Sequence, residues 1–108
     1  MPRQPPPPLT AEARRAALAT AAFARQERAG IRTALRERRL HLADVLTGEV
    51  SDSIQRMRVN VLLESVPGIG PARAEAIMAD IGISPTRRLR GLGHQQRAAL
   101  IARVAARG

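Results

Sequence analysis

A run with two glycines set between two prolines is the segment of this chain whose residue types best suit ligand binding. Residues 66–73 read Val-Pro-Gly-Ile-Gly-Pro-Ala-Arg. Glycine tolerates a positive φ and lets another molecule approach the backbone, and Pro71 suits the first turn of a helix. The first N–H groups of a helix lack partners within it and lie at the positive end of its dipole. The run therefore predicts an anion site at a turn between two helices, although a plain helix–helix turn would use the same residues.

A second glycine-bearing run follows at residues 86–93, Thr-Arg-Arg-Leu-Arg-Gly-Leu-Gly. Its leucines suit a core, whereas its arginines should lie on the surface. A guanidinium group is a planar fork of donors that matches phosphate oxygens. We expect one binding surface from both runs and their flanks, comprising Arg56, Arg58, Gly68, Ile69, Gly70, Pro71, Ala72, Arg73, Arg87, Arg88, Arg90, Gly91, Gly93 and His94.

Other chemistries find little support in the sequence. A dinucleotide fingerprint would need a third glycine where Arg73 stands, and a nucleotide P-loop would need a lysine, which this chain lacks. His41 and His94 have no metal-ligand spacing around them, and there is no cysteine. The acids are scattered, and no catalytic triad can be assembled. We therefore expect no enzyme activity and no metal site.

The charge balance indicates a polyanionic partner. The 108 residues include 18 basic ones, all arginine, and 9 acidic ones, which gives a net charge of +9. Arginine usage alone would also fit a GC-rich genome, but a sequence pI near 11.9 favours nucleic acid. Phe23 is the one aromatic residue, and proteins that bind single strands stack the bases on aromatic rings. We therefore expect double-stranded nucleic acid, recognised through its backbone.

The sequence contains neither an apolar run long enough to span a membrane nor a recognisable signal peptide. We therefore expect a cytoplasmic protein without a membrane partner. No self-complementary apolar surface is evident, so the expected state is a monomer.

The elements that must position these residues are helical by pattern, and the predicted fold class is all-α. Thr10 is a good N-cap for a long helix over residues 11–37, which is rich in Ala, Arg and Glu. A short amphipathic segment follows at residues 40–47. The predicted division of the chain is a Pro-rich tail at residues 1–9, a long arginine-rich helix at residues 10–39 and a compact core at residues 40–108.

Within the core, one helix with Asp52 or Ser53 as its cap should run to the first glycine turn, with Ile54, Met57, Val61 and Leu62 facing inward. The helix after that turn should stop at Gly82. Ser84-Pro85 should restart a short helix, and His94 or Gln95 should begin the last one.

The long helix also carries a basic stripe, made of Arg25, Arg28, Arg32, Arg36 and Arg39. At about 100° per residue these side chains share an arc of roughly 80°, provided that the helix reaches Arg39. A solvated helix face would explain the stripe equally well. Because the acids of the helix lie away from it, we favour a second phosphate-facing surface.

The order of helices and glycine turns over residues 58–104 resembles the helix-two-turns-helix motif of formamidopyrimidine-type DNA glycosylases and of a small-subunit ribosomal protein that binds rRNA. A glycosylase would need a separate catalytic domain, for which the chain is too short. Three segments look like the actinobacterial integration host factor family more closely: Met-Arg-Val at residues 57–59, Leu-Leu-Glu-Ser-Val-Pro-Gly-Ile-Gly at residues 62–70 and Ile-Gly-Ile-Ser-Pro-Thr-Arg-Arg-Leu-Arg-Gly-Leu-Gly at residues 81–93. Family members also begin their long helix after Pro-Leu-Thr, as residues 8–10 do here.

The resemblance implies a small nucleoid-associated protein that binds duplex DNA with little sequence preference, bends or compacts it and assists phage integration. It implies a long N-terminal helix beside a compact core. Its DNA contacts fall on the first turn and on Arg87, Arg88 and Arg90, and a monovalent cation could mediate the contact at the first turn. The family usually has lysine at the position of Pro71. The alternative is an RNA-binding or ribosome-binding module with the same motif.

Overall fold

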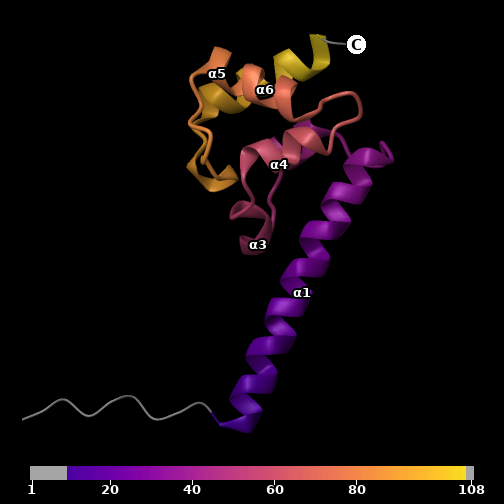
Figure 1. Ribbon diagram of the computed structural model, residues 1–108, viewed down its shortest axis with the longest axis vertical. Helices are drawn as coiled ribbons and strands as arrows, with labels where there is room; N and C mark the ends of the chain where they lie inside the picture. The colour runs from indigo at the N-terminus through magenta and orange to yellow at the C-terminus, as the bar shows by residue number, and fades with distance from the viewer. Residues whose placement is uncertain (1–9, 107–108) are drawn as a thin grey trace, which may run out of the picture.

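The computed structural model describes residues 10–106, and within that range its regular elements are helices. The predicted all-α fold class is confirmed. A long helix, α1 (Ala11–Arg36), projects from a cluster of shorter helices (Figure 1). No helix among these residues is long and apolar enough to cross a membrane. The tail predicted at residues 1–9 lies outside the described range.

Local signals set both ends of α1. Thr10 caps its start, because the hydroxyl oxygen accepts a hydrogen bond from the Ala13 N–H at 3.0 Å. The helix ends at Arg36, and Arg38 takes a positive φ of 60°. The backbone N–H of Arg39 then turns back to the Ala34 carbonyl at 2.9 Å. The expectation that Arg39 shares the helical stripe is therefore wrong; its Nε instead pairs with Glu37 at 2.9 Å.

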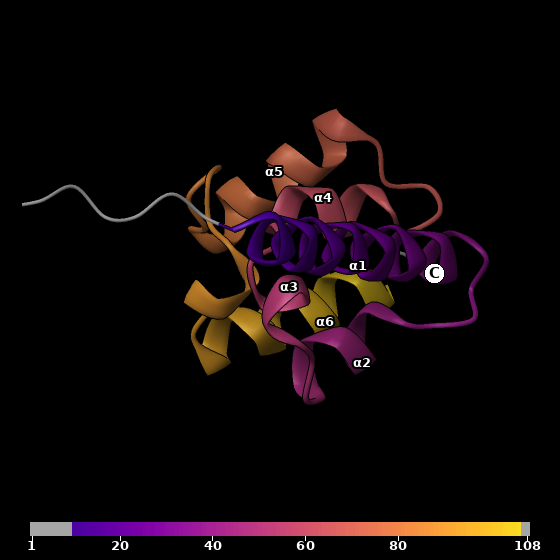
Figure 2. The same ribbon diagram turned by 90° about the horizontal axis from the view of Figure 1, so that it is seen from below.

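The core is built by the shorter helices, and α1 contributes to it only near its C-terminal end. Leu35 is the fully buried residue of α1, whereas Leu18 and Phe23 are 68% and 63% exposed. Seen from below, α4 (Val59–Glu64) and α5 (Pro71–Ile81) lie on one side of α1 (Figure 2). α2 (Leu42–Thr47) and α6 (His94–Ala106) lie on the other. The N-terminal half of α1 therefore contributes no buried residue to the core.

The single helix expected over residues 52–66 is wrong, because the chain breaks it into α3 (Asp52–Gln55) and α4. Between them Arg58 pairs with Arg88 as an isolated antiparallel bridge. The Met57 carbonyl accepts from the Leu89 N–H at 2.8 Å, and the Val59 N–H donates to the Arg87 carbonyl at 2.9 Å. These two long-range hydrogen bonds replace helical ones.

Two smaller expectations also change. The cap of α3 is Ser51, not Asp52 or Ser53, and its hydroxyl makes no capping bond. No helix restarts at Ser84-Pro85: the segment is a turn, closed by the Arg87 N–H on the Ser84 carbonyl at 3.0 Å. One 3₁₀ turn, η1 (Leu89–Gly91), follows. The chain must be extended at Arg88 to pair with Arg58, so a helix cannot continue there.

Candidate nucleic-acid interface

The first turn, residues 66–70, presents a helix N-terminus to solvent. Gly68 has a φ of 87°, which favours glycine, and the Ile69 N–H closes the turn on the Val66 carbonyl at 3.1 Å. Pro71 begins α5 as predicted, and the next two residues, Ala72 and Arg73, are exposed. The side chain of Ile69 is 4% exposed and anchors the turn in the core, so its predicted role in binding is limited to its backbone.

Gly70 differs from Gly68 in a way that matters for function. Its backbone is extended, with φ of −91° and ψ of −178°, a conformation open to any residue. A Cβ added there would meet nothing within 4 Å. The fold therefore does not require glycine at this position, whereas close approach of a ligand would.

The second turn, residues 82–93, holds its three arginines on the surface while Leu89 and Leu92 are buried. Arg87 folds over the turn and donates from Nη1 to the Gly91 carbonyl at 3.3 Å. A Cβ on Gly91 would lie 2.9 Å from Arg87 Cδ, so the missing side chain leaves room for this arginine. Arg88 donates from Nη1 to the Arg56 carbonyl at 2.7 Å. Two of the three predicted arginines are thus oriented by the backbone.

Arg97 of α6 holds the second turn from inside, a role that was not predicted from the sequence. Its guanidinium donates to the Leu46 and Leu89 carbonyls at 2.8 Å each and to the Leu92 carbonyl at 3.2 Å. It therefore ties α2 and the second turn to α6. The signal was available: Arg97, Leu100 and Val104 recur at helical spacing on the buried face.

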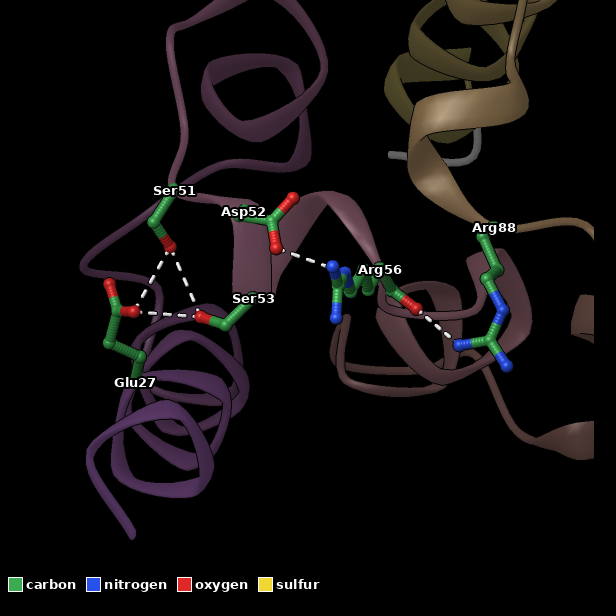
Figure 3. Close-up of polar contacts among 6 residues, drawn as sticks. All are labelled: Glu27, Ser51, Asp52, Ser53, Arg56 and Arg88. Carbon is green, nitrogen blue, oxygen red and sulfur yellow. Dashed lines mark hydrogen bonds and ion pairs between the residues drawn. The ribbon is translucent and has the colours of Figure 1, made fainter. Parts of the chain in front are cut away.

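The basic stripe of α1 is set in place by an acidic residue on the other flank of the helix. Glu27 Oε1 accepts from the hydroxyls of Ser51 at 3.1 Å and Ser53 at 2.7 Å, which fastens α1 to α3 (Figure 3). Arg28 and Arg32 follow Glu27 by about 100° and 140° around the helix. They therefore emerge beside the loop that leads from α3 to α4.

There they join arginines of the predicted first surface around one groove. The groove has a volume of about 420 Å³ and is lined by Arg28, Arg32, Arg56, Met57, Arg58, Val61 and Arg88. We call this the arginine groove. Arg36, further along α1, borders a second hollow together with Gly68 and Gly70 of the first turn. The stripe of α1 therefore borders both turns, with Arg28 and Arg32 beside Arg88 and with Arg36 beside the first turn. Arg25 and Arg39 line neither hollow.

Four further predicted residues line neither of these two hollows. Arg25, Arg90, Gly93 and His94 are exposed, and His94 begins α6 as predicted. The Gly93 N–H is engaged by the Gln96 side chain at 3.2 Å. Across residues 10–106, no cluster of three or more His, Cys, Asp or Glu side chains could hold a metal ion.

Comparison with known proteins identifies this architecture. Residues 35–104 match the S13-like H2TH domain, the helix-two-turns-helix fold. The chain is 50% identical over 95 residues to the integration host factor of Streptomyces coelicolor, which covers 87% of this chain and 89% of that protein. It is 46% identical over 96 residues to that of Mycobacterium tuberculosis, which covers 88% and 91%. The chain belongs to the actinobacterial integration host factor family.

A solved structure supports the same assignment. The structure of sIHF bound to an 8-bp palindromic DNA matches with a TM-score of 0.74 at 44% identity. The match covers 79% of this chain and 97% of that one. The resemblance seen in the sequence is therefore confirmed.

Proposed function

We propose that this chain is a nucleoid-associated protein that binds duplex DNA with little sequence preference. It contacts the phosphate backbone and the minor groove of the DNA. The observation that carries the proposal is that arginines of α1 border both turns: Arg28 and Arg32 line a groove with Arg58 and Arg88, and Arg36 lines a hollow with Gly68 and Gly70. A solved relative at 44% identity is described as bound to DNA, which supports the same partner here.

In this proposal the first turn grips one phosphate. The backbone N–H groups of Gly68, Gly70 and Ala72 converge on it at the positive end of α5, and Arg73 replaces the usual lysine as a nearby cation. A monovalent cation could complete this contact. No other cofactor and no catalytic step are needed, so we propose no enzyme activity.

The second turn acts on neighbouring phosphates. Arg87, Arg88 and Arg90 straddle the minor groove or enter it, where arginine responds to groove width more than to base identity. The flanking Arg56 and Arg58 extend this contact, and Arg25, Arg28, Arg32 and Arg36 of α1 follow a neighbouring stretch of backbone. We propose that contact of one duplex with both the turns and the projecting helix bends or compacts the DNA.

The cellular role follows from this activity. The protein acts as a monomer on the nucleoid in the cytoplasm, and it assists phage integration indirectly, through the DNA that an integrase also binds. Curvature of the DNA is what an integrase would use, because it brings distant sites together.

The experiment that tests the proposal is a fluorescence-anisotropy titration of a random-sequence duplex at several salt concentrations, with structured RNA as competitor. With about five phosphates neutralised, log K should fall by roughly 4.5 per decade of salt. Poor competition by RNA supports the hypothesis that duplex DNA is the partner. Tighter binding of RNA would instead favour a ribosome-type role, and a flat salt dependence would contradict both.

A further inference from the structure

The arginine groove carries positive charge that the acidic residues of the chain do not neutralise. Five guanidinium groups border it, and no carboxylate does. One of them, Arg56, is neutralised from outside by Asp52, whose Oδ2 lies 2.9 Å from Arg56 Nε (Figure 3). The remainder leaves a net charge near +4 around about 420 Å³. Like charges at this density repel one another unless an anion separates them.

A second observation concerns Arg32, whose side chain lines the same groove. The Nε of Arg32 is buried and has no hydrogen-bond partner. A buried donor without a partner loses its hydration and gains nothing in return, which is unfavourable unless a ligand supplies an acceptor. Arg88 is held over the groove by its bond to the Arg56 carbonyl, so this guanidinium is also oriented in advance.

The shape of the groove selects among phosphate ligands. A duplex is a convex rod whose phosphates can reach the rim, where Arg58 and Arg88 are exposed. A small, flexible anion can enter the recess and contact the Arg32 side chain that lines it. A chain of two or three phosphates carries about three to four negative charges near neutral pH, which matches the unbalanced charge, whereas one phosphate carries fewer than two.

We propose that the arginine groove binds a short oligophosphate, either free or as the tail of a nucleotide, with its oxygens accepting from the guanidinium forks of Arg28, Arg32 and Arg58. Bound there, the anion competes with DNA for Arg58 and Arg88. Only this competition rests on the proposed function; the binding site itself does not.

The test is a calorimetric titration of tripolyphosphate into the full chain without DNA at about 0.15 M salt. The groove variant is Arg28→Gln with Arg58→Gln. The matched control is Arg14→Gln with Arg15→Gln, which removes the same charge from exposed positions outside the groove. Wild type should bind about one anion per chain, and the groove variant should bind at least about tenfold more weakly, as expected for losing charge-assisted hydrogen bonds. The control should change by less than about threefold.

Three results would overturn the inference: no saturable binding by wild type, equal weakening in the control, or inorganic phosphate binding as tightly as tripolyphosphate. Titration with ATP distinguishes a free oligophosphate from the tail of a nucleotide. If ATP binds as tightly as tripolyphosphate, a nucleotide tail suffices as the ligand. If ATP binds much more weakly, the ligand is the free anion. If the groove variant fails to fold, amide chemical shifts of wild type decide. Tripolyphosphate should move Arg32, Arg56 and Arg88, and shifts confined to Gly68 and Gly70 would contradict the site. Failure to bind duplex would refute the proposed function alone.

Discussion

Replacing Arg97 by alanine should destabilise the protein far more than its place on an amphipathic helix suggests. The side chain is partly buried and serves three backbone carbonyls, of Leu46, Leu89 and Leu92. The residues that carry those carbonyls are buried, at 3%, 0% and 6% exposure. Truncation would leave three oxygens inside the protein without their charged donor.

The magnitude follows from the number of bonds. A hydrogen bond to a charged group contributes about 1.5–3 kcal/mol where water is excluded. Because Arg97 is only partly buried, we take about 1 kcal/mol per bond and expect a loss of about 3 kcal/mol in the free energy of unfolding. Urea unfolding followed by circular dichroism measures it, and with an m-value of about 1.5 kcal/mol/M the midpoint should fall by about 2 M.

Arg103→Ala is the matched control, because it removes the same charge from the same helix. Arg103 Nη2 pairs with Asp80 Oδ2 at 3.0 Å, but these side chains are 45% and 58% exposed, so the expected loss is below about 1 kcal/mol. At a temperature where the Arg97→Ala variant is still folded, the salt dependence of its DNA binding should match that of the Arg103→Ala control. A loss within about 1 kcal/mol of the control would refute the reasoning. A salt slope reduced by about one more unit than in the control would make Arg97 a phosphate contact.

Two further predictions concern the binding surface and its support. Gly70→Ala should leave the free energy of unfolding within about 0.5 kcal/mol of wild type, because a Cβ meets nothing within 4 Å there, yet weaken duplex binding by blocking the approach of a phosphate. Its control is Gly30→Ala, which also adds a Cβ in open space. This variant should raise helix stability by about 0.5–1 kcal/mol without weakening duplex binding. Equal duplex affinity in the two variants would exclude close approach of a phosphate at Gly70. Glu27→Ala should speed amide hydrogen exchange in α1, because it removes the acceptor of the Ser51 and Ser53 hydroxyls. Glu27→Gln should keep the wild-type exchange rate, because its amide oxygen can still accept. Unchanged exchange in Glu27→Ala would show that α1 is held by apolar contacts alone.

Local sequence signals were sufficient wherever structure is set by neighbours along the chain. Thr10 capped α1, Pro71 began α5, and Gly82 ended it with a φ of 83°. The apolar spacing in α5 and α6 placed Ile77, Leu100 and their neighbours in the core. Such features depend on contacts within a few residues, which the printed sequence contains.

The errors share a different cause. The break between α3 and α4 depends on two hydrogen bonds that the backbones of Met57 and Val59 form with Leu89 and Arg87, about thirty positions away, and helical periodicity carries no trace of them. Arg39 left the stripe because the chain reverses at Arg38, with no glycine to signal it. The convergence of Arg28 and Arg32 on the second turn could not be foreseen either, since it depends on how Glu27 docks against two serines.

The most direct test of the central claim compares two triple variants in the duplex salt titration. One replaces Arg87, Arg88 and Arg90 by alanine, and the other replaces Arg15, Arg39 and Arg103, which carry the same charge but lie outside the proposed contacts. If the second turn grips the DNA backbone, the first variant should flatten the slope of log K against log salt by about 2.7, and the second should change it by less than about one. Equal slopes in the two variants would show that net charge, and not this surface, determines binding.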